Sequence, residues 1–365
     1  MTAFKTLSAP VAPGGTIGIL GGGQLGRMLA MAAARLGLRT HIYSDTEKAP
    51  AFQVSAGRSL AAYDDEAALA EFARACDAVT FEFENVPGQT AAFLAGLVPV
   101  NPGPRALAIS QERYEEKRFV AGLGLKTAPF AAIDSRDDIA KAIKAIGCPA
   151  VLKTRRMGYD GKGQATIRNA KEAMEAFDRF QGVPLILEGF VDFAFEASVI
   201  AARGLDGSFA AYDPPGNEHE NHILRRSTVP CALSESQCAD AKGIARAIGE
   251  AFGYVGVFTV ELFVARDGAL LVNEIAPRVH NSGHWTLEAC MVSQFEQHMR
   301  AVAGWPLGDP ARHSNAVMEN ILGAEAHDWL RLAQNGSALH LYGKGEARPG
   351  RKMGHLTRLR PLTKD

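Results

Sequence analysis

Short apolar runs alternate with stretches of helical periodicity through the first third of the chain. Residues 16–20 predict a buried strand, 24–37 an amphipathic helix and 39–44 a second strand. A further helix is predicted at 65–76, followed by a strand at 78–83. Strands that alternate with helices predict a doubly wound parallel sheet with right-handed crossovers in this part of the chain.

The middle of the chain has longer helices and isolated apolar strands. Helices are predicted at 111–124 and 234–253, and strands at 148–155, 185–191 and 196–203. After Trp305 the periodic pattern weakens, and the basic, glycine-punctuated stretch 343–355 is predicted to be a loop. The chain is therefore predicted to combine an α/β part with an α+β part.

Length and composition narrow the class of protein. The 365 residues exceed one ordinary core, which predicts two or three domains. A net charge of -1 gives no basic footprint for nucleic acid, and no apolar run reaches the ~20 residues of a membrane span. Five cysteines without a CxxC pair, and an N-terminus without an apolar signal segment, predict a cytoplasmic location.

A glycine turn follows the first predicted strand. Gly21, Gly23 and Gly26 fit the G-x-G-x-x-G spacing, and Asp45 lies at the end of the next strand, where a dinucleotide fold places its ribose ligand. The free N–H groups at the start of the helix suit an anion. Three interpretations stay open at this point: an NAD site, a close-packed strand–helix turn, or a site for a phosphate of the substrate.

A hairpin is predicted around residues 267–268, an Asp-Gly pair between two apolar runs. A two-residue loop would pair Arg266 with Ala269. The same register places Glu261 opposite Glu274, with Cβ atoms about 5 Å apart. Like charges at that separation repel each other, so the pair needs a partner.

A divalent cation removes the conflict between the two glutamates. Hard carboxylate oxygens, with Asn273 beside them, suit Mg²⁺ together with phosphate, and Mn²⁺ is an alternative. The other interpretation is an exposed hairpin face on which both glutamates point into water. The predicted register argues against exposure, because it gives the same face to Phe263, Val272 and Leu270.

Two further stretches suggest phosphate chemistry. Lys153 ends an apolar strand, where a buried charge needs a partner, and the glycine-rich loop 156–164 follows it. Such a loop can close over a polyphosphate, although the spacing is not a Walker A motif; an ordinary flexible loop is the alternative. Downstream, Arg278, His280 and Asn281 cluster behind a proline, and arginine suits small oxyanions. A zinc site using His280 and His284 lacks the usual cysteine or helical context.

Taken together, several motifs resemble the ATP-grasp superfamily and, within it, the N5-carboxyaminoimidazole ribonucleotide synthetase family of purine biosynthesis. The resemblance covers residues 16 to 358 and rests on the motifs GGGQLGRM, TFEFENVP, GYDGKGQ, NEIAPRVHNSGHWT and RPGRKMGH. It implies a Rossmann-like pre-ATP-grasp domain at 1–110, an ATP-grasp domain at 111–305 and a small C-terminal domain at 306–365. The glycine turn is then expected to serve the substrate rather than a dinucleotide.

The resemblance also implies a reaction. ATP phosphorylates bicarbonate to carboxyphosphate, and the amine of 5-aminoimidazole ribonucleotide captures the carboxyl group, giving the N5-carbamate, ADP and phosphate. Mg²⁺ is implied as the metal, with neither biotin nor NAD. A homodimer is implied, with no nucleic acid or membrane partner.

Residue roles are carried over from the family motif by motif. The implied catalytic groups are Lys153, Arg278, His280 and Asn281. The implied ATP-binding groups are Arg113, Lys153, Gly158, Tyr159, Asp160, Gly161, Lys162, Gly163, Gln164, Glu188, Gly189, Phe190, Val191, Glu196, His219, Asn273 and Glu274, with Glu188, Phe190 and Val191 at adenine and Glu196 at the ribose. The implied metal ligands are Glu261 and Glu274. The implied substrate groups are Gln24, Leu25, Glu82, Lys344, Arg351 and Lys352.

One segment departs from the family pattern. Where the family reads Glu-Asn-x-His, this chain has Gly216-Asn217-Glu218-His219, so the acid is missing. Three rival functions are weighed beside the carboxylating enzyme: a formate-dependent glycinamide ribonucleotide transformylase, an NAD-binding oxidoreductase and a nucleotide sensor without turnover. The HNSGHWT and RPGRKMGH motifs favour the carboxylating enzyme over the transformylase.

Overall fold

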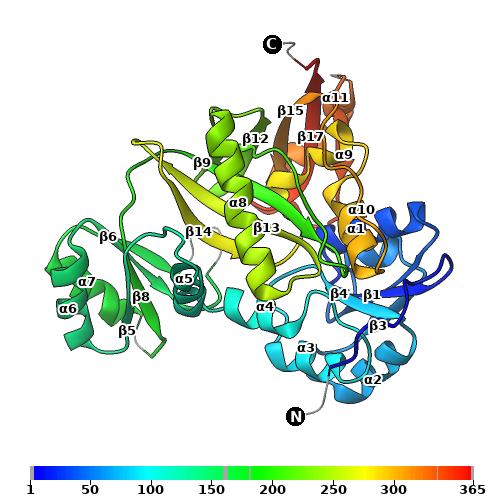
Figure 1. Ribbon diagram of the computed structural model, residues 1–365, viewed down its shortest axis with the longest axis horizontal. Coiled ribbons are helices and arrows are strands. Elements are labelled where there is room, and N and C mark those ends of the chain that lie inside the picture. The colour runs from blue at the N-terminus through cyan, green and yellow to red at the C-terminus, as the bar shows by residue number, and fades with distance from the viewer. Residues whose placement is uncertain (1–3, 159–162, 181, 335, 363–365) are drawn as a thin grey trace.

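The structure, a computed structural model, describes residues 4–158, 163–180, 182–334 and 336–362. Three sheets organise these residues, and each sheet has its own helices (Figure 1). The two smaller sheets lie at opposite ends of the view, with the large sheet between and above them. No helix among the described residues is long and apolar enough to cross a membrane.

The N-terminal sheet is parallel, in the order β3-β2-β1-β4, which confirms the predicted doubly wound arrangement. The apolar run TIGIL forms the central strand because almost all of its side chains are buried. The strands are β1 (Thr16–Leu20), β2 (Arg39–Ser44), β3 (Gly57–Leu60) and β4 (Ala78–Phe81). The helices are α1 (Gln24–Arg35), η1 (Pro50–Gln53), α2 (Glu66–Arg74), α3 (Gly88–Ala95) and α4 (Pro104–Ser110).

The second sheet is antiparallel, in the order β5-β8-β6-β7, and forms the lobe at the left of Figure 1 with α6 and α7. Its strands are β5 (Phe130–Ile133), β6 (Ala150–Thr154), β7 (Gln164–Ile167) and β8 (Leu185–Gly189). Its helices are α6 (Arg136–Ile146) and α7 (Ala170–Arg179), and α5 (Arg113–Gly122) connects this lobe to the rest of the molecule.

The large sheet has nine strands, in the order β14-β13-β9-β11-β12-β15-β17-β16, with β10 paired to β9. Its strands are β9 (Phe193–Arg203), β10 (Phe209–Ala211), β11 (Gly216–Glu220), β12 (Ile223–Val229), β13 (Gly256–Ala265), β14 (Leu270–Ala276), β15 (Asn315–Leu322), β16 (Ala338–Leu341) and β17 (Lys352–Arg360). Its helices are α8 (Glu235–Phe252), η2 (Asn281–Gly283), α9 (Thr286–Ala289), α10 (Gln294–Val302), η3 (Gly323–Asp328) and α11 (Trp329–Ala333).

The C-terminal strands belong to this large sheet, because β15 pairs with β12. The part of the chain after Trp305, where the hydrophobic periodicity is weak, therefore contains three strands. The predicted loop at 343–355 is wrong at its end, since β17 begins at Lys352 and pairs with both β15 and β16. Residues of β17 that were expected in a solvated loop are therefore part of the sheet, and some of them, such as His355, are fully buried.

The predicted two-residue hairpin is also wrong. Ala265 pairs with Ala269, so the loop has three residues and Gly268 adopts a φ of 84°. Glu261 nevertheless pairs with Glu274 as predicted, because a bulge restores the register: Leu262 pairs with Val272, which leaves Asn273 as an extra residue on β14. The bulge changes the face assignment, so Val272 and Leu270 lie in the apolar core and do not share the face of the glutamates.

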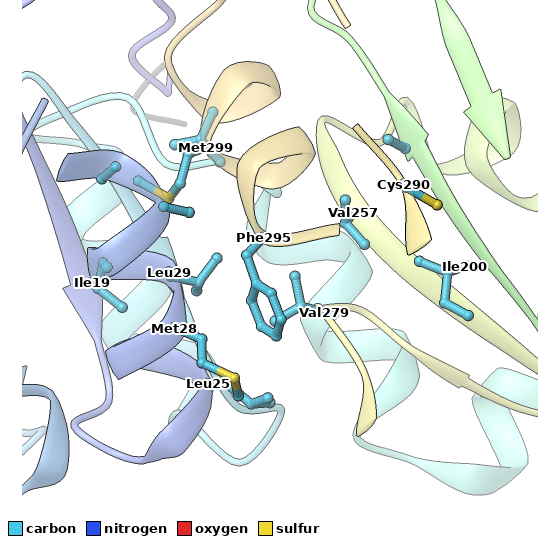
Figure 2. Packing of buried hydrophobic residues seen from close by; sticks show 14 of the residues in the cluster. Ile19, Leu25, Met28, Leu29, Ile200, Val257, Val279, Cys290, Phe295 and Met299 are labelled. Carbon is cyan, nitrogen blue, oxygen red and sulfur yellow. The ribbon is translucent and has the colours of Figure 1, made fainter. Parts of the chain in front are cut away.

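One apolar core holds the N-terminal sheet against the large sheet. In Figure 2 the ring of Phe295 on α10 lies between Leu29 of α1 and Val279. All three side chains are fully buried, and each contributes roughly 1.5–3 kcal/mol by leaving water. Val279 separates Arg278 from His280, so the same core fixes the backbone of the predicted catalytic segment.

Candidate active site

A cleft of about 1020 Å³ lies between the antiparallel lobe and the large sheet. It brings together strand ends, a helix start and a loop that are distant in the sequence. Most of the residues predicted for nucleotide, metal and catalysis line it: Arg113, Lys153, Gly158, Gln164, Glu188, Gly189, Phe190, Val191, Glu196, His219, Glu261, Asn273, Glu274, Arg278, His280 and Asn281, together with Lys352.

The two hairpin glutamates face this cleft, and each has a basic side chain of the chain as its partner. His280 Nε2 lies 3.0 Å from Glu261 Oε1, and Arg113 Nη1 lies 3.1 Å from Glu274 Oε2. Burial acts to raise the pKa of Glu261, but His280, His219 and Arg278 together lower it to about 2. Glu261 is therefore a carboxylate at neutral pH, with its oxygens directed at the positive side of the cleft.

The two glutamates are also the predicted ligands of a metal ion. No cluster of three or more His, Cys, Asp or Glu side chains suited to a metal occurs in the part of the chain that the structure describes. Mg²⁺, however, is usually held by one or two carboxylates together with substrate phosphates rather than by a full protein cage. The paired glutamates fit that requirement, and the bulge brings the Asn273 amide beside them.

Lys153 has the partner that its position demands. Its Nζ lies 3.0 Å from Glu188 Oε2, and the buried Lys117 Nζ lies 3.7 Å from the same oxygen. Burial acts to raise the pKa of Glu188, yet the two lysines lower it to about 2. The Glu188 carboxylate therefore faces these lysines, and the next residues, Gly189 and Phe190, also line the cleft.

The predicted oxyanion groups are held by partners from other elements. Arg278 Nε donates to Glu84, whose pKa Arg278 lowers to about 2 against the opposing effect of burial. Asn281 exchanges hydrogen bonds with Asn320 of β15, at 3.0 and 2.6 Å. His280 Nδ1 lies 2.8 Å from Ser282 Oγ. These partners fix the directions in which the three side chains present their remaining polar atoms.

The segment that departs from the family pattern also lies at the cleft. His219 Nδ1 lies 2.7 Å from Glu196 Oε2. Burial acts to lower the pKa of His219, but Glu196 more than offsets it and the pKa is raised. Asn217 is buried in a hydrogen-bonded chain with Ser198 and Ser227, so it has a structural role.

The glycine turn is filled from inside the molecule. Glu82, only 6% exposed, accepts hydrogen bonds from the backbone N–H of Gly23 and, at 2.6 Å, from that of Gly26. Its burial raises its pKa, against the effects of these N–H groups, Arg278 and Lys344. The carboxylate occupies the position at the start of α1 where a dinucleotide fold holds its pyrophosphate. The backbone N–H groups of Gly23 and Gly26 are therefore already bonded to Glu82 and are not available to an NAD phosphate.

The remaining predicted substrate groups gather beside that turn. Lys344 Nζ donates to the Lys352 carbonyl at 2.7 Å, and burial, with Arg351 nearby, lowers the pKa of Lys344 to about 8. Gln24 begins α1 and Leu25 is buried within it. These groups lie outside the nucleotide cleft, and Lys352 is the one predicted substrate residue that also lines it.

Part of the predicted glycine loop lies outside the described residues, namely Tyr159, Asp160, Gly161 and Lys162. On its far side, Gly163 has a φ of 70° and its carbonyl accepts from Thr154 N at 2.8 Å. Gly158 O accepts from Arg113 Nη2 at 3.3 Å. Both ends of the loop are therefore anchored at the cleft.

Sequence reasoning missed several residues that hold the site. Glu84 lies two positions after Glu82 in the motif TFEFENVP. Its presence in the same motif could have indicated that it belongs to the site. Asn320 carries no local signal, because its strand lies far from Asn281 in the sequence. Glu116 and Lys117 were also missed, since two opposite charges in a highly charged helix start are typical of an exposed surface.

Three family models match successive parts of the chain. A ribonucleotide synthetase preATP-grasp domain matches residues 15–111, an ATP-grasp domain matches 118–295, and a phosphoribosylaminoimidazole carboxylase C-terminal domain matches 316–364. Together they extend over nearly the whole chain.

Two relatives are similar over nearly their full lengths. An N5-carboxyaminoimidazole ribonucleotide synthase from Brucella melitensis is 52% identical over 354 residues, which are 96% of this chain and 98% of that protein. The enzyme of the same name from Pseudomonas aeruginosa is 45% identical over 343 residues, 93% of each chain.

Solved structures share the fold. The ADP complex of an N5-carboxyaminoimidazole ribonucleotide synthetase has a TM-score of 0.93 at 38% identity, covering 97% of this chain and 94% of that one. An N5-carboxyaminoimidazole synthase from Aspergillus clavatus, in complex with ADP and 5-aminoimidazole ribonucleotide, has a TM-score of 0.88 at 31% identity over 96% and 94%.

Proposed function

The chain belongs to the N5-carboxyaminoimidazole ribonucleotide synthase family of ATP-grasp enzymes, and we infer from that membership that it carboxylates 5-aminoimidazole ribonucleotide in purine biosynthesis, using ATP. The observation that carries this conclusion is the full-length similarity to enzymes of that name. The cleft geometry supports it, because one cavity unites paired acids, a half-buried lysine and an arginine–histidine segment.

We propose that the antiparallel lobe holds ATP. The backbone of Gly189, Phe190 and Val191 would meet adenine, and Glu196 would bind the ribose. Lys153 and Arg113 would bind the phosphates, since both are cations directed into the cleft and fixed by carboxylates. The loop 158–164 would close over the phosphates and exclude water.

Mg²⁺ would be held by Glu261 and Glu274, with Asn273 beside them, and Mn²⁺ could replace it. When bound, the metal would neutralise charge on the phosphates. Binding would require the side chains of His280 and Arg113 to release these carboxylates. The released side chains would then be available for the oxyanions of the reaction.

Arg278, His280 and Asn281 would bind bicarbonate beside the terminal phosphate. Bicarbonate is a poor electrophile and must be activated before an amine can attack its carbon. An oxygen of bicarbonate would therefore attack the γ-phosphorus, ADP would leave, and carboxyphosphate would form. The exocyclic amine of the ribonucleotide would then attack its carboxyl carbon, and phosphate would leave. Catalysis would consist of positioning and charge neutralisation, with Arg278 held in place by Glu84.

The ribonucleotide would lie between the glycine turn and the basic end of β17. Lys344, Arg351 and Lys352 would bind its phosphate, while Gln24, Leu25 and Glu82 would form the opposite wall. The pKa of about 8 for Lys344 leaves it largely protonated at neutral pH, as phosphate binding requires.

Release of phosphate from ATP tests the reaction. It is expected to require both bicarbonate and 5-aminoimidazole ribonucleotide, with the carbamate detected by isotope transfer from labelled bicarbonate. Formate with glycinamide ribonucleotide is expected to give no phosphate. Turnover with that second pair alone would replace the proposal by the transformylase.

We also propose a cytoplasmic homodimer with the domain boundaries 1–110, 111–305 and 306–365. The described cysteines are all unpaired, in keeping with a reducing compartment. Light scattering at micromolar concentration tests the dimer, and a monomer mass would exclude it.

A further inference from the structure

Lys117 on α5 is a buried cation whose role the proposed reaction does not include. Only 1% of the residue is exposed. Its Nζ donates to the Asn273 carbonyl at 2.7 Å and to the Val272 carbonyl at 3.3 Å. It also lies 3.7 Å from Glu188 Oε2. Many lysines bury only their aliphatic stem and keep the ammonium group in water. Lys117 is not of this kind, because its ammonium group is itself enclosed.

The two carbonyls belong to the bulge on β14. Asn273 is the extra residue that separates the pair Leu262–Val272 from the pair Glu261–Glu274. A bulge leaves ladder groups unpaired and has to be held by other partners. Lys117 supplies donors to the carbonyls on the N-terminal side of Glu274.

The neighbouring Glu116 supplies the complementary contact. Its Oε1 accepts a hydrogen bond from Ile275 N at 2.7 Å, and the residue is 2% exposed. Two consecutive residues of α5 therefore bind the β14 backbone immediately before and immediately after Glu274. The backbone on either side of this residue is thereby fixed relative to α5.

Lys117 also reaches the other side of the cleft. Glu188, which it faces, lies near the end of strand β8 of the antiparallel lobe and accepts a hydrogen bond from Lys153 Nζ at 3.0 Å. One ammonium group thus contacts the large sheet through the bulge and the small lobe through Glu188. Burying an ion is costly, and a purely apolar residue would fill the same space without that cost.

We propose that Glu116 and Lys117 are positioning residues that fix the spacing between the metal-binding end of the cleft, Asn273 and Glu274, and its phosphate-binding end, Glu188 and Lys153. The pair does not touch the reacting atoms. It sets the distance at which Glu274 and Lys153 can act on one polyphosphate. This inference rests on the proposed function of the cleft, in which those groups bind Mg²⁺ and ATP.

The test compares Lys117→Met with wild type and with Lys171→Met as a matched control. Met keeps the length and apolar stem of lysine, and Lys171 is an exposed lysine, 86% accessible, on α7. Calorimetric titration with Mg²⁺-ADP, without turnover, is expected to show affinity reduced about tenfold or more in Lys117→Met and unchanged in Lys171→Met. In steady-state assays the KM for ATP should rise likewise, while that for the ribonucleotide stays within about twofold.

Glu116→Leu supplies a second, independent variant. Hydrogen exchange of the peptide that contains Ile275 is expected to be faster in this variant, because its amide loses its acceptor. Its Mg²⁺-ADP affinity should fall in the same direction. If Lys117→Met does not fold, the Mg²⁺-ADP affinity of Glu116→Leu alone tests the positioning role.

Wild-type affinity for Mg²⁺-ADP in a folded Lys117→Met or Glu116→Leu protein would overturn the inference. So would equal increases in the KM values for ATP and ribonucleotide, which indicate general loosening of the fold. Failure of the proposed function would instead appear as a wild-type protein without ribonucleotide-dependent phosphate release, and the binding measurements would still be valid.

Discussion

The glycine turn at α1 and the acidic hairpin of β13 and β14 are both neutralised by the chain itself, but in different ways. At the turn, Glu82 fills the anion position from a buried site and hydrogen-bonds two backbone amides. At the hairpin, Arg113 and His280 bind the acids from a cleft that is open to solvent. Side chains in a cleft can be displaced by a ligand, whereas a buried carboxylate on fixed amides cannot.

The carboxylates of the two regions also differ in the direction of their pKa shifts. Burial dominates at Glu82 and raises its pKa, whereas neighbouring cations lower the pKa of Glu261 to about 2. A sequence motif such as the glycine turn or the acidic hairpin therefore indicates that an oppositely charged group binds there. It does not indicate whether that group belongs to a ligand or to the protein. Four experiments test this difference between the two regions.

The largest effect is expected from Glu274→Gln at the hairpin. Loss of one charge from the proposed metal pair should lower kcat at least about 10³-fold, because charge neutralisation of the phosphates carries most of the catalysis. Unfolding in urea should stay cooperative. Glu175→Gln on the exposed surface of α7 is the control, and more than a tenth of wild-type activity in Glu274→Gln would contradict the metal assignment.

Acid stability should distinguish the cleft carboxylates from Glu82. The folded-state pKa of Glu188 is lowered to about 2 from its ordinary 4.5, so its contribution of ~3 kcal/mol is present above pH 4.5. That contribution should be lost as the pH falls from about 4.5 to 2. Urea unfolding of wild type and Glu188→Gln over this range checks it, and parallel pH profiles would show that Glu188 does not contribute.

Glu84→Gln should have a smaller effect on catalysis. Arg278 would lose a charged partner, and such hydrogen bonds are worth about 1.5–3 kcal/mol, which predicts a fall of roughly 10- to 100-fold in kcat/KM. Steady-state kinetics with bicarbonate as the varied substrate measures it. An unchanged value would mean that Arg278 keeps its orientation without Glu84.

The smallest effect is expected from Glu82→Gln at the turn. Because the folded-state pKa of Glu82 is raised, its contribution to stability is present at low pH and is lost as the pH rises through that pKa. The neutral glutamine lacks this dependence, so its stability should change less than that of wild type as the pH is raised from 4.5, and the two proteins should differ by only ~1 kcal/mol. Equilibrium dialysis should detect no NAD binding to either protein; tight NAD binding would reopen the dinucleotide interpretation.

Much of the fold was predictable because local patterns specify local elements. The apolar run TIGIL and the helical periodicity after it predicted β1 and α1 nearly to the residue. The alternation of strands with helices predicted the parallel sheet. The strands β15 to β17 were not recognised, because their partners lie far away in the sequence and a glycine-punctuated segment separates β16 from β17.

The order of residues along the chain specifies which chemical groups are available: the acids of the hairpin, the lysine near the end of β6 and the motifs shared with one enzyme family. How those groups are used depends on the folded molecule. Glu261 and Glu274 are opposite each other because a bulge compensates for a longer loop, and Glu82, which follows β4 and is far away in the sequence, closes the glycine turn. Register and burial depend on contacts between segments far apart in the chain, and no local pattern encodes them.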